Sequence, residues 1–332
     1  MPRYSIIIPV YNRPDEVEDL LKSLSEQTNN DFEVVIVEDG STIPCRDIVE
    51  KYSSTIDVKY FYKSNEGRSI ARNYGMERAA GSYFIFFDSD CMIPASYFTT
   101  LSAALEREPL DCFGGPDAAH ASFSPTQKAI NYAMTSFLTT GGIRGGKIQM
   151  EKFVPRTFNM GYSRRVWQTV GGFREMFSED IDMSTRVRQA GFSIGLIRDA
   201  YVYHKRRIDF VKFFRQVHVF GMSRITLKLL YPDSLKIVHT LPAIAVIIGI
   251  ALLLLSIFVS PLWLLPIGVY LLALFCDAWR QTRSVRIAML ALPAGVIQIV
   301  GYGTGFIRAF TSKILLGKGR DINQEIEMRR GK

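Results

Sequence analysis

Thirty-seven consecutive residues without a charged side chain, from Thr240 to Cys276, restrict the fold of this 332-residue chain more than any other feature. A second uncharged stretch follows from Ile287 to Ile307. Each stretch is long enough to cross the hydrocarbon core of a bilayer as a helix. Because Ser260-Pro261 interrupts the longer stretch, we expect two spans, Leu241–Phe258 and Leu262–Cys276, and a third membrane segment after them.

The charges around the third segment predict an unusual path. Arg280, Arg283 and Arg286 precede it, and the basic tail 313–332 follows it. Positively charged flanks stay on the cytoplasmic side, so both ends of the segment belong on one side of the membrane. Since Pro293 and several glycines interrupt its sequence, we expect a re-entrant or broken hairpin here, in place of a plain third span.

A basic stretch lies immediately before the apolar region. Between Arg198 and Lys236 nine residues are basic and three are acidic, which favours contact with anionic lipid. Within it, 209–231 alternates aromatic and basic residues and predicts an amphipathic helix in the membrane interface. A surface helix on the catalytic domain is the alternative. We expect no nucleic-acid partner, because no nucleic-acid-binding module is visible.

The first two hundred residues have the composition of an ordinary globular domain. Met1-Pro2-Arg3 leads directly into an apolar strand, so we expect no signal peptide and a cytoplasmic location for this part. The four cysteines are scattered and form no C-x-x-C pair, which predicts free thiols. The whole chain is then a multi-pass protein of the inner, cytoplasmic membrane.

Strands and helices alternate in this globular part. Apolar runs of strand length cover 4–10, 33–38, 58–62 and 83–87, and the segments between them have helical spacing. Such alternation predicts an α/β fold with a parallel sheet and helices on both faces. Polar residues follow all four strands, at the edge where such sheets bind ligands: Asn12, Asp39, Asn65 and Asp88.

Asp88-Ser89-Asp90 closes the run Tyr83–Phe87 with two carboxylates. Carboxylates at this position can hold Mg²⁺ or Mn²⁺ against a diphosphate. The alternative is a simple turn, since Asp and Ser also favour turns.

Five motifs in order across residues 4–204 resemble family 2 glycosyltransferases. They are Ser5–Arg13, Glu38-Asp39-Gly40-Ser41, Asn65-Glu66-Gly67 with Ala71-Arg72-Asn73, Asp88-Ser89-Asp90, and Gly171-Gly172-Phe173 with Ser178–Asp182 and Arg186. The resemblance implies a GT-A fold, that is, a Rossmann-like nucleotide-diphospho-sugar transferase domain, and sugar transfer from a nucleotide diphosphate sugar.

The resemblance also implies roles for individual residues. Asp39 would accept a hydrogen bond from the base, Arg72 would pair with the diphosphate, and Asp88 would reach the ribose or the metal. The expected donor-binding set is Pro9, Tyr11, Asn12, Asp39, Asn65, Arg72 and Asp88. The expected Mn²⁺ or Mg²⁺ ligands are Asp88, Asp90 and His204. Arg72 as a solvated helix charge, and His204 as a structural residue, are the alternatives.

The late acidic block supplies the expected catalytic residues. Asp180 is favoured as the general base that takes the proton of the acceptor hydroxyl, and Glu179 is its competitor. Asp182 and Arg186 have the spacing of a helical ion pair. Phe158-Asn159-Met160-Gly161 would line the acceptor pocket, although Phe158 could equally belong to the core.

These expectations divide the chain into a GT-A catalytic domain (1–208), an interfacial helix (209–236), membrane segments (237–310) and a basic cytoplasmic tail (311–332). We expect an inverting, metal-dependent transferase that uses a UDP-sugar and a lipid or lipid-linked glycan acceptor. A processive polysaccharide synthase is the main alternative, but 215–220 lacks the Trp of the Q-x-x-R-W block of those enzymes. A nucleotidyl or phosphoryl transferase would need a phosphate loop, and a non-catalytic scaffold would not need the acids.

Overall fold

The computed structural model describes residues 3–118, 123–141, 153–205 and 209–318. The chain forms two compact units, each described here by itself. Of the described residues, 3–118 and 153–205 belong to the first unit, and 123–141 and 209–318 belong to the second. The Gly145-Gly146-Lys147 stretch, which could be mistaken for a phosphate loop, lies outside the described residues.

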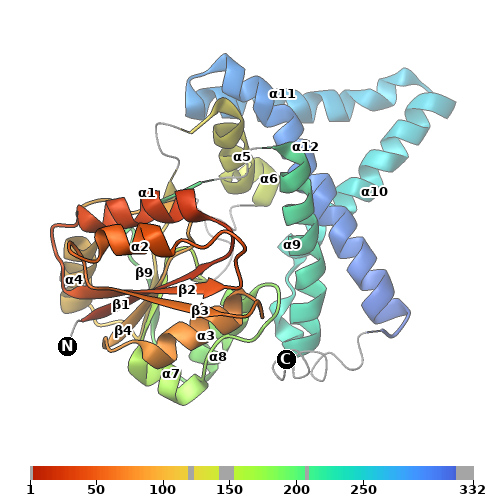
Figure 1. Cartoon of the computed structure of the whole chain (residues 1–332). Helices are drawn as coiled ribbons and strands as arrows, with labels where there is room; N and C mark the ends of the chain where they lie inside the picture. Colours follow the sequence, from red (N-terminus) through yellow and green to blue (C-terminus); the bar gives the residue numbers. More distant parts are fainter. Residues whose placement is uncertain (1–2, 119–122, 142–152, 206–208, 319–332) are drawn as a thin grey trace. The chain divides into compact units, whose positions relative to one another are not determined.

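The first unit is built on a seven-stranded sheet with the order β3-β2-β1-β4-β8-β6-β9 (Figure 1). Its first four strands in the chain are parallel neighbours, as the alternating sequence predicts. The sheet is mixed, because β8 pairs antiparallel with β4 and β6. The strands are β1 (Tyr4–Val10), β2 (Phe32–Asp39), β3 (Val58–Lys63), β4 (Tyr83–Phe86), β6 (Cys112–Gly114), β8 (Met160–Ser163) and β9 (Ile194–Leu196).

Helices cover both faces of this sheet and bury two separate apolar cores. Alternate residues of β1 face opposite cores: Ile6 and Ile8 contribute to one, and Ile7 to the other. One core receives α1 (Pro14–Ser25), α2 (Arg46–Tyr52) and α4 (Tyr97–Arg107). The other receives α3 (Arg68–Arg78), α7 (Arg164–Val170) and α8 (Glu179–Gln189).

A small second sheet has the order β5-β10-β7. Its strands, β5 (Cys91–Met92), β10 (Val202–His204) and β7 (Asp117–Ala118), are only two or three residues long. The register places His204 opposite Cys91 and Val202 opposite Asp117. Three distant parts of the chain therefore meet directly after the end of β4.

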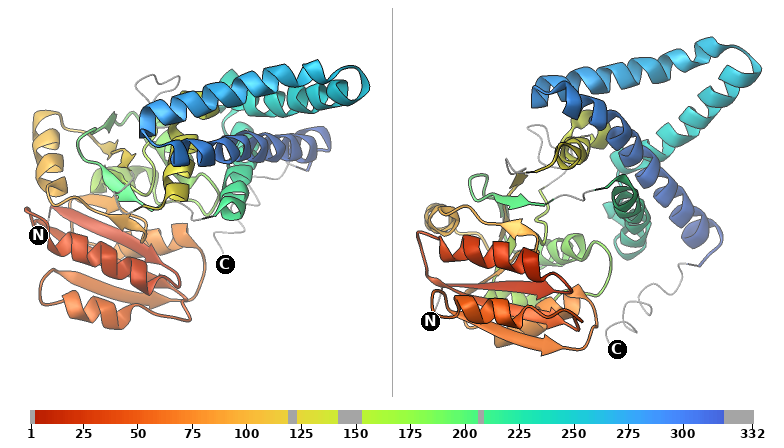
Figure 2. Two further views of the ribbon diagram at one scale, coloured as in Figure 1. Left: turned by 90° about the horizontal axis from the view of Figure 1, so that it is seen from above. Right: turned by 45° about the horizontal axis from the view of Figure 1, so that its top comes forward.

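The second unit consists of helices. They are α5 (Pro125–Thr135), α6 (Phe137–Thr140), α9 (Phe210–Leu230), α10 (Ile237–Phe258), α11 (Leu265–Thr282) and α12 (Val285–Ala309), with short helices η1 (Pro232–Ser234), η2 (Pro261–Leu264) and η3 (Phe310–Leu315). Figure 2 shows α10 and α11 joined at one end as a hairpin.

Among the described residues, three helices are long and apolar enough to cross a membrane: Ile237–Phe258, Pro261–Thr282 and Val285–Leu315. The prediction of a broken hairpin in the third segment is wrong. Pro293 lies inside one continuous helix, α12, because an interior proline removes one hydrogen bond without ending a helix that neighbouring helices hold in place.

Small residues let α12 approach its neighbours closely. A Cβ atom on Gly305 would lie 2.0 Å from the backbone oxygen of His218 in α9, and one on Gly303 would lie 2.5 Å from that of Pro242 in α10. The predicted helix 209–231 exists as α9, and it buries Phe213, Val217 and Ile225 within this unit.

We predict that Gly305→Ala destabilises the helical unit, because the added methyl group would overlap a backbone oxygen. Overpacking of this kind costs about 1–3 kcal/mol. The matched control is Gly249→Ala in α10, where an added Cβ meets no atom within 4 Å. Thermal unfolding in detergent should show a lower midpoint for the first variant only. Equal midpoints would contradict the close approach.

Candidate active site

A cavity of about 350 Å³ opens at the carboxyl ends of the parallel strands. Four residues expected to bind the donor line it: Pro9, Tyr11, Asp39 and Asn65. Val10 and Gly67, which belong to two of the quoted motifs, also line the cavity, together with four residues that the sequence did not single out: Arg68, Glu175, Met176 and Phe177. The expected ligand edge of the sheet therefore carries a real hollow, and the loop before α8 closes one side of it.

Asp39 holds the loop that leads from β3 into α3. One of its carboxylate oxygens accepts hydrogen bonds from Lys63 Nζ at 2.9 Å and from the Glu66 N–H at 3.0 Å. The other accepts from the Gly67 N–H at 2.9 Å. A carboxylate has about four lone-pair sites, so Asp39 retains acceptor capacity on the cavity side.

Gly67 is required where the loop before α8 meets α3. Its φ of +105° favours glycine, and a Cβ atom there would lie 2.6 Å from the Glu175 carboxyl carbon. The Glu175 carboxylate instead accepts a hydrogen bond from the Ser69 N–H at 3.0 Å, in the first turn of α3. This contact fixes one wall of the cavity.

Asn12 supports the cavity without lining it. Its side-chain oxygen accepts hydrogen bonds from the backbone N–H groups of Thr42 and Ile43, at 2.8 and 3.0 Å. Its own N–H donates to Ser41 Oγ at 2.8 Å. The structure thus gives the Asn12 side chain a positioning contact with the loop after β2.

Arg72 joins the two acidic blocks of the sequence. Its guanidinium donates to Asp88 Oδ1 at 2.7 Å and to Glu179 Oε1 at 3.0 Å. The side chain is 1% exposed, so the solvated-charge interpretation is wrong. The D-x-D turn after β4 and the start of α8 are therefore neighbours, although 91 positions of the chain separate Asp88 and Glu179.

Arg68 is the cation that sequence reasoning missed. It lies one helical turn before Arg72, lines the cavity and is 52% exposed, and it donates to Glu179 Oε2 at 2.9 Å. Its spacing of four residues from Arg72 is the signal that could have identified it.

Glu179 and Asp180 lie in the first turn of α8, where the helix dipole favours negative charge. Glu179 is buried, and burial raises the pKa of its carboxyl against the opposing pull of Arg68 and Arg72. Its carboxylate accepts hydrogen bonds from both of these arginines.

Asp180 has a different environment. Its carboxylate accepts a hydrogen bond from Arg156 at 3.2 Å and another from the Ile181 N–H at 2.8 Å. Burial pushes the pKa of Asp180 upward, but Arg156 and the Ile181 N–H outweigh it and hold this pKa below its ordinary value. The side chain remains 14% exposed, against 3% for Glu179.

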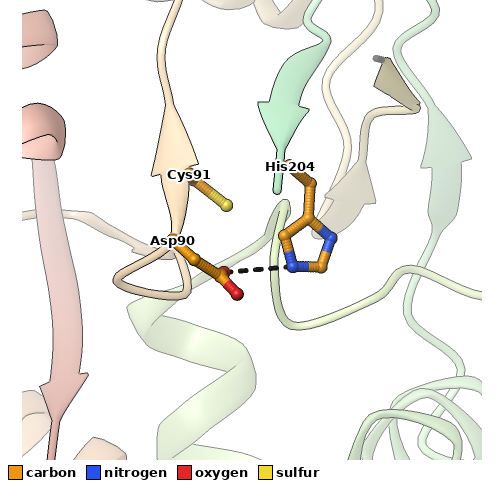
Figure 3. Close-up of side chains that lie close together, drawn as sticks. All are labelled: Asp90, Cys91 and His204. Carbon is orange, nitrogen blue, oxygen red and sulfur yellow. Dashed lines mark ion pairs between the residues drawn. The ribbon is translucent and has the colours of Figure 1, made fainter. Parts of the chain in front are cut away.

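The expected metal ligands separate into two groups. His204 Nε2 lies 3.1 Å from Asp90 Oδ1, and the Cys91 sulfur lies in the same cluster, with all three ligand atoms within 4.8 Å of one another (Figure 3). Asp88 pairs with Arg72 and is not part of this cluster. Burial raises the pKa of the Cys91 thiol, which favours its protonated form.

Phe158 stacks on the His204 ring at a centroid distance of 4.7 Å. We expected 158–161 to line an acceptor pocket, and this expectation is wrong for Asn159 and Met160. Asn159 and Met160 are buried, and Asn159 donates to the Ala200 carbonyl oxygen at 2.8 Å. Asp182 and Arg186 form the helical ion pair that their spacing predicts, at 3.0 Å.

This α/β architecture, with an acidic turn after β4 facing a second acidic block, is that of GT-A glycosyltransferases. The family model for glycosyl transferase family 2 matches residues 5–171, which is half of the chain. The chain belongs to this family.

Several curated proteins are similar to it. Glycosyltransferase AglE of Haloferax volcanii is 25% identical over 250 residues, 71% of this chain and 80% of AglE. The uncharacterized glycosyltransferase EpsJ of Bacillus subtilis is 26% identical over 205 residues, 60% of this chain and 57% of EpsJ. An uncharacterized glycosyltransferase of Rickettsia conorii is 42% identical over 88 residues, and the match spans 26% of this chain but only 15% of that protein.

A solved structure shares the fold over nearly the full chain. The mannosyltransferase PcManGT of Pyrobaculum calidifontis, solved in complex with GDP-Man and Mn²⁺, superposes with a TM-score of 0.56 at 17% identity. The superposition covers 96% of this chain and 88% of that one.

We predict that Arg72→Met destabilises the first unit, which we call the catalytic unit, by about 3–5 kcal/mol. The substitution leaves two carboxylates without their shared buried cation. Arg68→Met is the matched control and should cost about 1 kcal/mol or less, since Arg68 is half-exposed. Denaturant unfolding of the two variants measures the difference. A similar loss in both would contradict the bridging role of Arg72.

Proposed function

We propose that this glycosyltransferase moves a sugar from a nucleoside diphosphate sugar, of the UDP class, to a membrane-associated lipid or lipid-linked glycan, with inversion at the anomeric carbon. The observation that carries the proposal is the Arg72 bridge. It brings the Asp88-Ser89-Asp90 turn and the start of α8 together beside one cavity. A donor diphosphate and an acceptor hydroxyl can then meet in one place.

The donor nucleotide would occupy the cavity lined by Pro9, Tyr11, Asp39 and Asn65. Tyr11 is 51% exposed and presents a ring on which a base can stack. Asp39 would accept from the base. The diphosphate would contact Arg68, and not Arg72 as expected from the sequence, because Arg68 is the arginine that lines the cavity.

Asp90 and His204 would hold a divalent cation, Mn²⁺ or Mg²⁺. Asp88 would add a second negative charge to the same turn. A carboxylate oxygen suits such an ion, and histidine is a common metal ligand. The pairing of β5 with β10 holds His204 next to Asp90, which directly precedes β5. When bound, the cation would neutralise charge on the departing nucleoside diphosphate. Cys91, buried and hydrogen-bonded to the Phe158 carbonyl oxygen at 3.6 Å, is left out of this ligand set.

Asp180 would act as the general base. An ionised carboxylate must take the proton of the acceptor hydroxyl. At the same time, the hydroxyl oxygen forms a bond to the anomeric carbon, and the bond between that carbon and the diphosphate breaks. The lowered pKa keeps Asp180 ionised near neutral pH. A single carboxylate facing the acceptor is consistent with one displacement and inversion. Glu179 would instead position Arg68 and Arg72.

The three apolar helices support a membrane-bound enzyme. We place the catalytic unit in the cytoplasm, at the inner membrane, because the basic stretches 198–236 and 280–286 lie at the two ends of the α10–α11 hairpin and such stretches stay on the cytoplasmic side. The acceptor is then a molecule of the bilayer.

Release of nucleoside diphosphate from a panel of UDP- and GDP-sugars, with native lipid extract and Mn²⁺ or Mg²⁺, tests the proposal. A panel with no turnover would contradict it.

We predict that Asp180→Asn lowers turnover by at least about 10²-fold, the typical contribution of a general base. Donor binding, measured by calorimetry, should persist because Asp180 does not line the cavity. The matched variant Glu179→Gln should instead lower stability through the two arginines. Loss of donor binding in Asp180→Asn would show that the general-base assignment is wrong.

We also predict that Arg156→Gln moves the acid limb of the pH–activity profile to higher pH. Arg156 lowers the pKa of Asp180, so its removal raises the pH below which the base is protonated and inactive. Arg107→Gln, on the exposed end of α4, is the control and should leave the profile in place. An unmoved acid limb in Arg156→Gln would mean that Asp180 does not govern it.

A further inference from the structure

The helical pair α5–α6 belongs to the same unit as the apolar helices, although its sequence lies between two strands of the catalytic unit. The thirteen residues from Ala129 to Gly141 include no charged side chain. This uncharged segment also contains polar residues such as Asn131 and Ser136, and it is too short to span a bilayer. Its length is that of a buried, re-entrant or interfacial element.

Contacts place α5 along α11 and α12. Ala129 and Tyr132 pack against Leu274, Ala278 and Ala288. The Tyr132 hydroxyl donates to Asp277 Oδ2 at 2.7 Å. These contacts lie near the end of α11 that adjoins α12, so α5 begins close to the turn between these two helices.

The α6 end of the pair contacts α11 about one helical turn further along, at Tyr270. The Tyr270 hydroxyl donates to the Leu138 carbonyl oxygen at 3.3 Å. Tyr270 lies near the middle of the candidate span Pro261–Thr282. It is twelve residues before Thr282, which corresponds to about 18 Å along a helix.

Two large apolar side chains of α6 are exposed at this depth. Phe137 is 57% exposed and Leu138 is 38% exposed, and the neighbouring Val269 and Leu272 of α11 are exposed to a similar degree. Exposed apolar side chains therefore lie on α6 as well as on α11. Exposed apolar surface of this kind indicates a binding partner.

Hydrogen bonds within the second unit satisfy the polar groups of α6. The Ser136 hydroxyl donates to Asp277 Oδ2 of α11 at 3.3 Å, and the other bonds lie inside the helical pair. Thr139 Oγ1 donates to the Ala133 carbonyl oxygen at 2.6 Å, and Thr140 Oγ1 donates to the Ser136 carbonyl oxygen at 2.8 Å. The Ser136 hydroxyl accepts from the Leu138 N–H at 3.2 Å. Internal hydrogen bonds of this kind are what a segment needs where no water is available.

We propose that α6 is a membrane-inserted element and that lipid acyl chains cover Phe137 and Leu138. The catalytic unit would thus be tied to the bilayer by an internal segment of its own sequence as well as by the C-terminal helices. The inference rests on the proposed membrane placement of α11, and the test below separates the two.

The test uses the full chain with Cys276→Ser, reconstituted in phosphatidylcholine vesicles containing phosphatidylglycerol. Nitroxide labels are attached to Phe137→Cys, Leu138→Cys, Thr126→Cys and Leu272→Cys, one at a time. Their collision rates with oxygen, which concentrates in lipid, and with a water-soluble nickel chelate are then measured. Thr126, in the first turn of α5, is the water-side control, and Leu272 in α11 is the lipid-side control.

We expect the labels at 137 and 138 to follow Leu272→Cys, with more oxygen than nickel collisions, and Thr126→Cys to show the reverse. Nickel access at both 137 and 138 would overturn the inference. Protection from both reagents, with broadening from label–label contact, would mean that a second copy of the chain covers α6, which would also overturn it. Nickel access at Leu272→Cys would overturn the membrane placement of α11 itself.

Discussion

The contacts of the buried Arg72 guanidinium are the interaction on which the arrangement of the candidate active site depends. The guanidinium lies between a carboxylate that follows β4 and one that begins α8, so a single cation balances acids from two distant parts of the chain. Two carboxylates this close would repel each other without it. Because Arg68 shares Glu179 from the cavity side, the same charge network also shapes one wall of the cavity where we propose that the donor binds.

Much of the catalytic fold could be predicted from the sequence, because its signals are local. The apolar runs at 4–10 and 83–87 and the polar residues that follow them define parallel strands and their ligand edge. The antiparallel strand β8 could not be predicted, since its place between β4 and β6 depends on long-range pairing. The same holds for β5, β7 and β10, whose two or three residues carry no periodic pattern.

The residues of the candidate site could be predicted only in part, because local signals in the sequence do not show which side chains touch. The resemblance to family 2 glycosyltransferases pointed to Asp90, His204, Asp180 and Arg72, but not to which of them touch. That Arg72 is buried, and that Arg68 lines the cavity, follows only from the packing of α3 against α8. In the helical unit, hydropathy located α10, α11 and α12, whereas α5 and α6 escaped notice because their apolar segment is shorter than a span.

The central claim is that Arg72 and Glu179 stabilise each other as a buried pair, and a double-mutant cycle tests it most directly. Denaturant unfolding of the detergent-solubilised chain would be compared for Arg72→Met, Glu179→Gln and the double variant. The account predicts that the double variant loses less stability than the sum of the two single losses, with a coupling of about 0.5–3 kcal/mol. Strictly additive losses would contradict it.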